Sequence, residues 1–432
     1  MTAKSPISLS RPVKRRSIRS LAPLEDLSQQ PGVAITRMPG GRVTLRTDIS
    51  QFYPSIYTHA VDWAVRGKAV AKKSRRVKVL GTQLDARLRE SRDGQTVGIS
   101  IGPDTSWLIS ELILARVDER MCRLHPRLVT HGFRVVDDMT YYASSIGEAH
   151  DVLANYQQVL AEYELALNPT KVSIVDGLES PHSAWVSRLR ASRYRDDRDA
   201  LLASDLIDLF TLAFELRKTH PTQGVLSYAI QMCDPFPGGS QSWPVYRDLV
   251  LASLSQEPST LRHVYQVLTF AKGHGLDVKD DRLVQVLNEA GAHHARYGHG
   301  YEVSWILTTL RELALPLDVA TARLVAEMED NASLVLLADM LLGDPGLYSS
   351  VDFSAAVRRG ARPGALSTSD WLLAYELRRR KWCAPSKWDG IVQWQELHKA
   401  GVDFLLSRSA SSARRRLRRR RPTFIAGWSY TN

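Results

Sequence analysis

The hydrophobic positions of the chain change their spacing near residue 196. Before that point, short apolar runs predict β-strands, and longer segments with apolar positions every three or four residues predict amphipathic helices. The expected strands are residues 43–49, 133–138, 140–143 and 171–175, and the expected helices are residues 105–121 and 148–165. Strands that alternate with helices predict an α+β fold whose sheet is covered by helices on one face.

After residue 196 only helical patterns follow. Apolar stripes separated by Gly-, Pro- or Asp-rich breaks lie in residues 204–220, 259–273, 281–291, 301–313, 319–330 and 332–344. Ser204 is expected to be the N-cap of the first of these helices. The segments have no strict sequence period, but a succession of helices of this length predicts an irregular helical-repeat array in a separate all-α domain.

Composition and charge narrow the functional classes only slightly. A net charge of +11 favours nucleic acid, nucleotides or an acidic membrane surface as partners. Much of the excess lies in one basic stretch, which could bind nucleic-acid phosphates or only keep the protein soluble: Arg414, Arg415, Arg416, Arg418, Arg419, Arg420 and Arg421. No apolar run approaches the roughly 20 residues of a membrane-spanning helix, and three widely spaced cysteines favour a reducing cytoplasm.

Three acidic residues stand at expected strand ends. Asp48 closes the first strand, and Asp137 and Asp138 lie at the expected turn of a β-hairpin. Neighbouring carboxylates repel one another unless a divalent cation binds them. Two such ions catalyse phosphoryl transfer, and oxygen ligands favour Mg²⁺ or Mn²⁺. The ordinary alternative is an Asp-Asp turn together with an aspartate that caps a helix.

The acids belong to an ordered set of motifs. TDISQFYPSIYTH (residues 47–59), GISIGPDTSWLISELIL (98–114), RVVDD (134–138) and LALNPTK (165–171) resemble motifs A to D of reverse transcriptases in order and spacing. The sequences of the first two motifs, together with GHGYEVSW (298–305), most resemble those of the prokaryotic abortive-infection and defence-associated reverse transcriptases of the AbiA/AbiK kind. This resemblance implies a right-hand polymerase palm with reduced fingers, followed by an all-α helical-repeat domain in place of a thumb.

The resemblance also implies a division into four parts. These are a basic N-terminal arm with reduced fingers (1–42), palm and fingers (43–195), the helical-repeat domain (196–405) and an Arg-rich tail (406–432). The region before Asp48 is too short for complete fingers. The residues that could replace the missing triphosphate contacts are Arg42, Arg46, Lys68, Lys72, Lys73, Arg75 and Arg76, although the last five are more typical of a solvated loop.

Metal-binding roles follow from the motif match. Asp48 and Asp137 would bind both Mg²⁺ ions (or Mn²⁺), and the Ile49 carbonyl would assist them. Asp138 would shape the hairpin and add negative charge. These roles define the expected catalytic centre of a nucleotidyltransferase.

Substrate-binding roles follow in the same way. Tyr53 would exclude the ribose 2′-hydroxyl, Gly102 and Pro103 would lie against the nascent base pair, and Arg46 would contact the substrate. Lys171 is a candidate general acid for the leaving pyrophosphate. The ordinary alternatives are a core aromatic for Tyr53, a simple turn for Gly102 and Pro103, and a solvated lysine for Lys171.

The expected function is a cytoplasmic DNA polymerase of antiphage defence that consumes dNTPs and forms homo-oligomers. The resemblance implies untemplated, protein-primed synthesis of a DNA product. An RNA-templated reverse transcriptase and a catalytically reduced nucleic-acid-binding scaffold remain open as alternatives. Val135 and Ile101 replace an aromatic residue and a glutamine that are usual in the wider family, which indicates altered substrate handling.

Two further patterns carry less weight. His293, His294 and His299, with Glu302, could indicate a metal site, but polar residues at a helix end are the more ordinary interpretation. The spacing of Arg120 and His125 is the only sign of a toxin-like ribonuclease.

Overall fold

The computed structural model describes residues 5–12, 21–23, 30–74, 78–179, 183–192, 203–234, 236, 239–383, 388 and 390–406. It confirms the α+β class, with a small antiparallel sheet and many helices. The chain divides into two compact units between Ser183 and Ala184, before the change in pattern at residue 196. Arg75, Arg76 and the arginines of residues 414–421 lie outside the described residues.

The first unit is built on a four-stranded antiparallel sheet in the order β4-β5-β3-β6. Its strands are β3 (Val43–Thr47), β4 (Gly132–Val135), β5 (Asp138–Ala143) and β6 (Ser173–Asp176). The helix α6 (Asp104–Leu124) follows β3, and α8 (Ile146–Ala161) follows β5. The resulting order, β-α-β-β-α-β, is the split βαβ arrangement.

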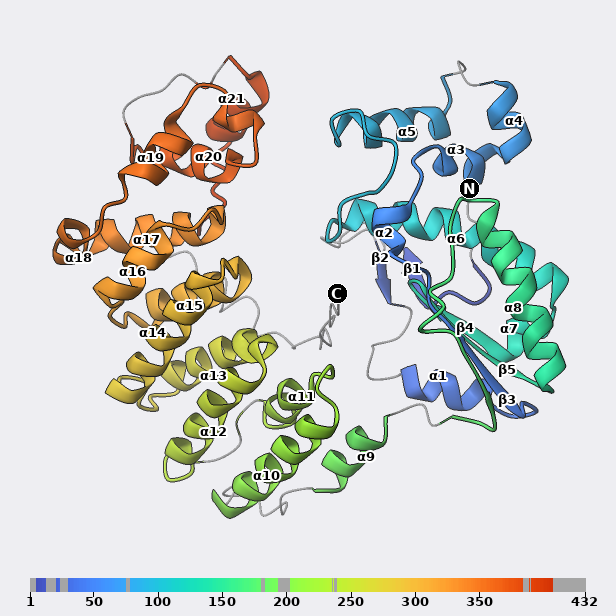
Figure 1. Cartoon of the computed structure of the whole chain (residues 1–432), viewed down its shortest axis with the longest axis horizontal. Helices are drawn as coiled ribbons and strands as arrows, with labels where there is room; N and C mark the ends of the chain where they lie inside the picture. The colour runs from blue at the N-terminus through green and yellow to red at the C-terminus, as the bar shows by residue number, and fades with distance from the viewer. Residues whose placement is uncertain are drawn as a thin grey trace. The chain divides into compact units, whose positions relative to one another are not determined.

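One face of this sheet is covered by helices. The helix α8 contacts β3, β5 and β6, and α6 packs beside α8 (Figure 1). Side chains from alternate strand positions, among them Leu45, Met139 and Tyr141, are buried beneath them. Because successive side chains of a strand point to opposite faces, Arg46 and Thr140 lie on the other face.

Shorter elements complete the first unit. They are β1 (Ser10–Pro12), which pairs with β2 (Leu21–Pro23), α1 (Gln30–Arg37), α2 (Phe52–Ser55), α3 (His59–Arg66), α4 (Lys68–Lys73), α5 (Leu80–Glu90) and α7 (Leu128–His131). The helices α4 and α5 pack on α3, and α3 packs on α6.

The second unit is helical throughout its described residues. Its α-helices are α9 (Ala184–Ala191), α10 (Ala203–Thr219), α11 (Val225–Met232), α12 (Trp243–Gln256), α13 (Leu261–Gly273), α14 (Asp281–Arg296), α15 (Gly300–Leu313), α16 (Val319–Ala326), α17 (Asn331–Gly343), α18 (Pro345–Ser350), α19 (Ser354–Ala361), α20 (Trp371–Arg379) and α21 (Val392–Lys399). Two 3-10 helices, η2 (Pro258–Thr260) and η3 (Ala365–Ser367), join some of them. Ser204 lies inside α10, so the predicted N-cap there was wrong.

These helices pack mainly on neighbours one or two places along the chain. The pairs α12–α13, α13–α15, α14–α16, α15–α17 and α17–α20 are in contact, and Figure 1 shows the helices side by side in chain order. Most of their inward side chains form one large apolar core, and a second, smaller cluster contains Ala365, Leu366, Ala374 and Tyr375. No helix in the described part of the chain is both long and apolar enough to cross a membrane.

Candidate functional site

The register of the sheet brings Asp48 beside the β4–β5 hairpin. Strand β3 pairs with β5 from Val43 opposite Ala143 to Thr47 opposite Met139, so Asp48 follows on the same line as Asp138. Neighbouring strands lie about 4.8 Å apart. The backbone carbonyl of Asp48 accepts a hydrogen bond of 2.8 Å from the Asn168 N–H, and the Asp48 side chain is only 7% exposed. Asp48 is therefore held in place next to the hairpin turn.

The hairpin turn itself is strained. Val135 pairs with Asp138, which leaves Val136 and Asp137 as the two turn residues. The favoured two-residue turns need a positive φ at their first position, where Gly or Asn is usual. Val136 adopts a φ of +52° there, a conformation that costs a β-branched residue roughly 1–3 kcal/mol. Such strain persists only where surrounding contacts fix the backbone.

Arg134 supplies such a contact. Its guanidinium is fully buried and donates a hydrogen bond to the Val136 carbonyl. The same group forms ion pairs with Asp118 at 2.7 Å and with Glu111 at 2.9 Å, both on α6. Burial alone would raise the pKa of Glu111, but the nearby Arg134 guanidinium outweighs it and lowers that pKa. Arg134 thus joins α6 to the peptide that precedes Asp137.

Residues 5–10 brace the same network from the N-terminal side. Ser8 forms a parallel bridge with Arg134, and the Arg134 N–H donates to the Ile7 carbonyl at 2.8 Å. The Ser8 hydroxyl donates to Glu111 at 2.9 Å, and the Ser5 hydroxyl donates to Asp118. Part of the predicted N-terminal arm therefore lies along β4, where its serine hydroxyls donate hydrogen bonds to Glu111 and Asp118.

The sequence analysis missed Arg134, Glu111 and Asp118. Two signals were present. Glu111 and Asp118 are seven residues apart, which places them on the same face of a helix. Arg134 interrupts an apolar strand on the side that faces the core. A buried arginine opposite two acids on one helical face is the combination that would have identified the network.

The three acids share one electrostatic environment. Burial raises the pKa of Asp137, and the charge of Asp48 raises it further. Burial, followed by the charges of Asp137 and Asp48, raises the pKa of Asp138 to about 6, although its side chain is exposed. Neighbouring carboxylates thus make the ionisation of Asp137 and of Asp138 less favourable, which is the condition that a divalent cation relieves.

Lys171 is the nearest cation to Asp48 among the described residues. Its Nζ lies 3.1 Å from Asp48 Oδ2, and its side chain is 55% exposed. The hydrogen bond to Asp48 raises the pKa of Lys171, so this lysine is protonated at neutral pH. The backbone of the loop is fixed by a 3.1 Å hydrogen bond from the Lys171 N–H to the Asn168 carbonyl. A protonated, half-exposed amine therefore lies at the rim of the acidic cluster.

Ile49 and Tyr53 follow Asp48 in the expected positions. Ile49 forms an isolated bridge with Leu167, and the two hydrogen bonds that flank it do not use the Ile49 carbonyl. Tyr53 is half-buried in α2, with its ring 5.3 Å from that of Phe52. Its carbonyl accepts a hydrogen bond of 2.9 Å from the Ile99 N–H, which ties α2 to the loop before α6.

Gly102 and Pro103 lie in that loop. Both are exposed, and Pro103 is the N-cap of α6. Gly102 has a φ of +111°, and a Cβ atom added to it would meet nothing within 4 Å. The backbone conformation thus favours glycine at this position. The preference for glycine does not come from crowding, because a side chain at this position would meet no neighbouring atom.

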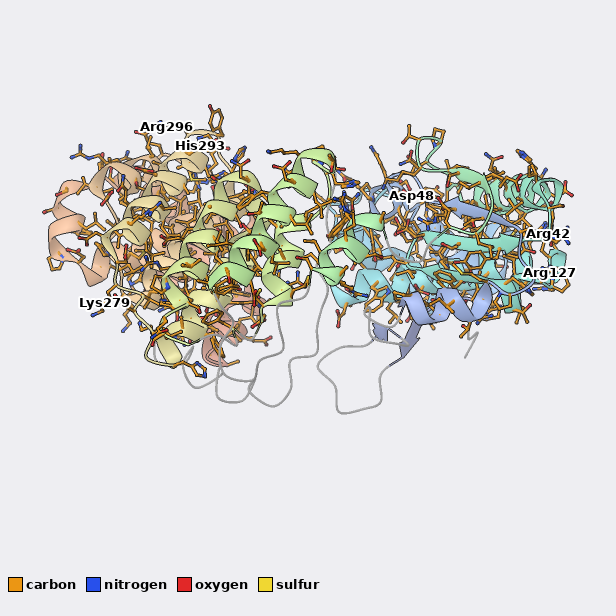
Figure 2. The ribbon with its side chains drawn as sticks, turned by 90° about the horizontal axis from the view of Figure 1, so that it is seen from below. Arg42, Asp48, Arg127, Lys279, His293 and Arg296 are labelled. Atoms are coloured by element: carbon orange, nitrogen blue, oxygen red, sulfur yellow. The ribbon has the colours of Figure 1, made fainter. Side chains whose placement is uncertain are left out.

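The candidate triphosphate residues differ in their surroundings. Arg46 lies on the open face of the sheet and forms an ion pair of 2.8 Å with Glu179. Arg42 precedes β3 whereas Asp48 follows it, so the two residues lie roughly 20 Å apart (Figure 2). Lys68 stacks over the Trp63 ring at 4.2 Å and pairs with Glu164. Of these three residues, Arg46 is therefore the best placed to contact a triphosphate bound near Asp48.

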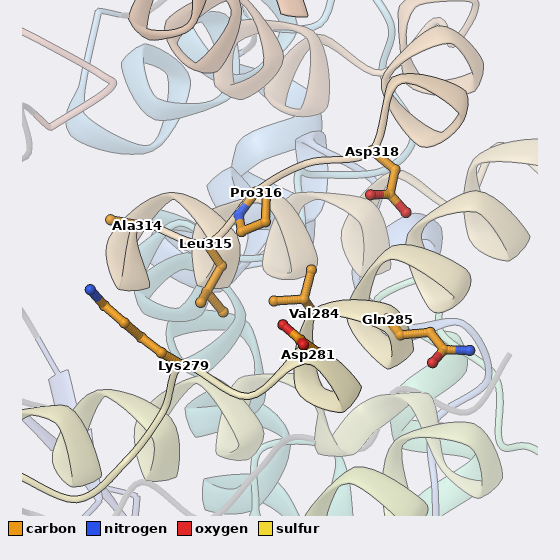
Figure 3. A pocket seen from close by; sticks show the side chains of 8 residues that line it. All are labelled: Lys279, Asp281, Val284, Gln285, Ala314, Leu315, Pro316 and Asp318. Carbon is orange, nitrogen blue, oxygen red and sulfur yellow. The ribbon is translucent and has the colours of Figure 1, made fainter.

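One pocket of the second unit is separate from these residues. It has a volume of about 390 Å³ and is lined by Lys279, Asp281, Val284, Gln285, Ala314, Leu315, Pro316 and Asp318 (Figure 3). Lys279 and Asp318 lie on opposite sides of it. The lining has neither a nucleophile beside a base nor a group of close metal ligands.

Neither a scan against models of known protein families nor a search among curated proteins finds a match for this chain.

Proposed function

We propose that the chain is a reverse transcriptase-like DNA polymerase that transfers nucleotides from dNTPs at the Asp48–Asp137–Asp138 cluster. One observation carries the proposal. Acids separated by about ninety residues of sequence converge at the end of a split βαβ sheet, next to a strained turn that a buried arginine braces. Such an acidic cluster is what two-metal phosphoryl transfer requires.

The donor set fits Mg²⁺ or Mn²⁺. Carboxylates of Asp48 and Asp137, with the Ile49 carbonyl, are hard oxygen ligands. Burial and then the repulsion between carboxylates raise the pKa of Asp137 and Asp138, and a bound cation would relieve that repulsion. When bound, the two ions would activate the attacking 3′-hydroxyl and stabilise the leaving pyrophosphate. Lys171 would then exchange its Asp48 partner for the pyrophosphate and donate a proton to it.

The fold supports the same assignment. The sheet with helices on one face and acids at one strand end suits a polymerase palm, and the array of neighbouring helices in the second unit suits a helical-repeat domain. Tyr53, on α2 directly after the Asp48 segment, suits a steric gate for the sugar. The antiphage role, untemplated and protein-primed synthesis, and homo-oligomers rest on the motif resemblance.

The test is incorporation of labelled dNTPs by the purified full chain with Mg²⁺ or Mn²⁺. Asp137→Ala should abolish incorporation, whereas Asp176→Ala, which removes an exposed acid of the same sheet, should not. Unchanged incorporation by Asp137→Ala would defeat the proposal.

The same assay separates the alternatives. An RNA-templated enzyme would make a product that follows the sequence of an added RNA, and RNase would stop synthesis. A nucleic-acid-binding scaffold would bind RNA or DNA and incorporate no dNTP.

A further inference from the structure

The turn between α14 and α15 brings two histidines together. The α14 helix ends at Arg296, and Gly298 then adopts a φ of +67°, the left-handed conformation that commonly closes a helix. The His299 N–H donates to the His294 carbonyl at 3.0 Å, which returns the chain to the last turn of α14. The backbone thus fixes His299 next to His294.

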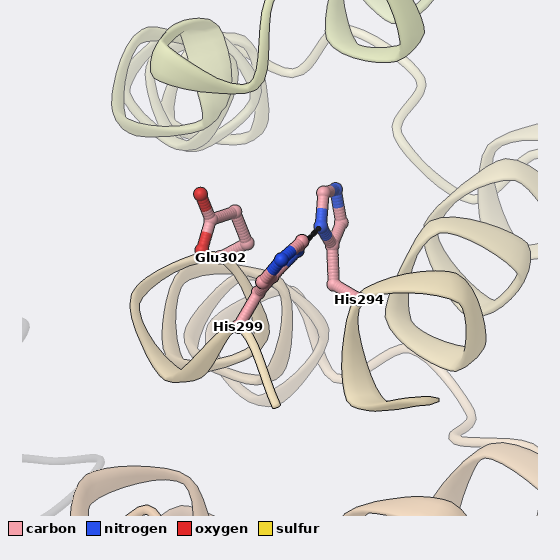
Figure 4. A group of neighbouring side chains, drawn as sticks. All are labelled: His294, His299 and Glu302. Carbon is pink, nitrogen blue, oxygen red and sulfur yellow. Dashed lines mark hydrogen bonds between the residues drawn. The ribbon is translucent and has the colours of Figure 1, made fainter. Parts of the chain in front are cut away.

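Their side chains point at each other. The two Nδ1 atoms lie 3.0 Å apart, and Glu302 stands three residues after His299, on the same face of α15 (Figure 4). One donor atom from each of these three residues lies within 4.8 Å of the others. In a tetrahedral zinc site neighbouring ligand atoms are about 3.3 Å apart, so the histidines already have nearly the required spacing.

Glu302 is able to complete the set. Its side chain is only partly buried, and within the described residues it makes no hydrogen bond or ion pair. A rotamer change of this carboxylate can therefore shorten the remaining distance without breaking a side-chain hydrogen bond or ion pair. In the present arrangement one Nδ1–H must donate to the other Nδ1, and a metal ion would take the place of that shared proton.

Burial and charge also suit a cation. His294 is only 7% exposed, so an ion bound there would be partly shielded from solvent, and the ring would bind it through a neutral imidazole nitrogen. Asp330 adds negative charge nearby, because a Cβ atom on Gly300 would lie 2.4 Å from the Asp330 Cγ. Two imidazoles and one carboxylate favour Zn²⁺, Co²⁺ or Ni²⁺ over Mg²⁺.

We propose that His294, His299 and Glu302 bind one Zn²⁺-type ion that ties the end of α14 to the start of α15. The fourth position is left to water, as in sites with three protein ligands. This site is independent of the proposed polymerase activity, since all of its ligands come from the second unit. The competing explanation is a pair of histidines whose mutual hydrogen bond only closes the turn.

Cobalt binding distinguishes the two explanations. The untagged full chain is stripped of metal and titrated with Co²⁺, in an Asp48→Asn, Asp137→Asn background that removes the acidic cluster. We expect one equivalent to bind with the visible absorption of four-coordinate Co²⁺, and Zn²⁺ to displace it. His299→Ala should remove this absorption, and Glu302→Gln should weaken binding by about tenfold or more.

His293→Ala is the matched control, because His293 is exposed and adjoins His294 without being among the three ligands. It should bind Co²⁺ as the parent does. Circular dichroism establishes that each variant is folded; His299 is exposed, so its replacement should leave the helices intact. The proposal is overturned if the parent binds no equivalent of Co²⁺, or if His299→Ala binds it with unchanged affinity and spectrum.

Discussion

The β4–β5 turn of the first unit and the α14–α15 turn of the second each bring together side chains that we propose as metal ligands, but by different means. In the first, Asp48 and Asp137 come from distant segments, and the turn contains a valine at a φ of +52°. In the second, the ligands lie within nine residues, and a glycine at a φ of +67° closes the turn without strain. A site assembled from distant segments needs a buried network to hold it, whereas a local site needs only its turn.

Loss of that network should have the largest effect. Arg134→Met leaves Asp118 and Glu111 buried without their cation, which should lower the free energy of unfolding by roughly 3–5 kcal/mol. Because the Val136 carbonyl also loses its donor, the apparent affinity for Mg²⁺ should fall by roughly 10–100-fold. Urea denaturation and dNTP incorporation against Mg²⁺ concentration measure the two effects.

Arg123→Met provides the control on the same helix. Arg123 is 71% exposed and pairs with Glu119 at the surface, so its loss should cost less than about 1 kcal/mol. If the two variants had equal stability and equal Mg²⁺ dependence, Arg134 would have no bracing role.

The N-terminal brace should contribute less. Ser8→Ala removes one hydrogen bond to Glu111, which keeps its contacts with Arg134 and Ser10. We expect a loss of about 1 kcal/mol in the free energy of unfolding. Ser55→Ala, which removes a hydroxyl that donates to the nearby carbonyls of Ser50 and Phe52, is the comparison in urea denaturation. Equal losses would mean that residues 5–10 add nothing particular to the hairpin.

The acidic cluster should destabilise the protein when no divalent cation is present. The folded-state pKa of Asp138 is raised to about 6, so between about pH 4 and pH 6 the folded state binds more protons than the unfolded state. Stability of the metal-free protein should therefore fall as the pH rises through this window and level off above about pH 6.

Asp138→Asn should remove this part of the pH dependence. It should also stabilise the metal-free protein at pH 7, because it removes an unfavourable negative charge. The gain should be only roughly 1 kcal/mol, since solvent screens the exposed carboxylate. Thermal unfolding at several pH values in chelator checks both statements. A metal-free parent that gains stability between pH 4 and pH 6, with Asp138→Asn following the same curve, would contradict them.

The smallest effect on catalysis is expected at the histidine turn. His299→Ala should leave dNTP incorporation in Mg²⁺ unchanged, since Asp48, Asp137 and Asp138 all belong to the first unit. In contrast, Zn²⁺ at about 100 times its Kd should stabilise the parent by about 2.7 kcal/mol and the variant by much less. Equal loss of incorporation in His299→Ala and Arg134→Met would show that the two turns are not independent.

The strands, the hairpin and the main helices could be predicted because their signals are local. The alternation around Leu45 and the apolar runs on both sides of Asp137 are visible in short windows of sequence. The start of α10 was predicted wrongly, with Ser204 as the N-cap, because a residue that is typical of an N-cap can also lie inside a helix.

The support of the site could not be predicted, because it depends on long-range contacts. Ser5 and Ser8 sit in a polar N-terminal stretch, yet they bond to acids of α6 more than one hundred residues away. Arg42 was a plausible triphosphate contact by sequence, but its distance from Asp48 follows only from the direction of β3. The motif residues could be proposed as a site because the order of motifs is itself a long-range signal.

The most direct test is the position of Mn²⁺ in crystals of the full chain soaked with the ion and a dNTP. Anomalous scattering should place Mn²⁺ in contact with the carboxylates of both Asp48 and Asp137. Carboxylates of Asp48 and Asp137 that face different regions, with no ion shared between them, would contradict the proposed polymerase site.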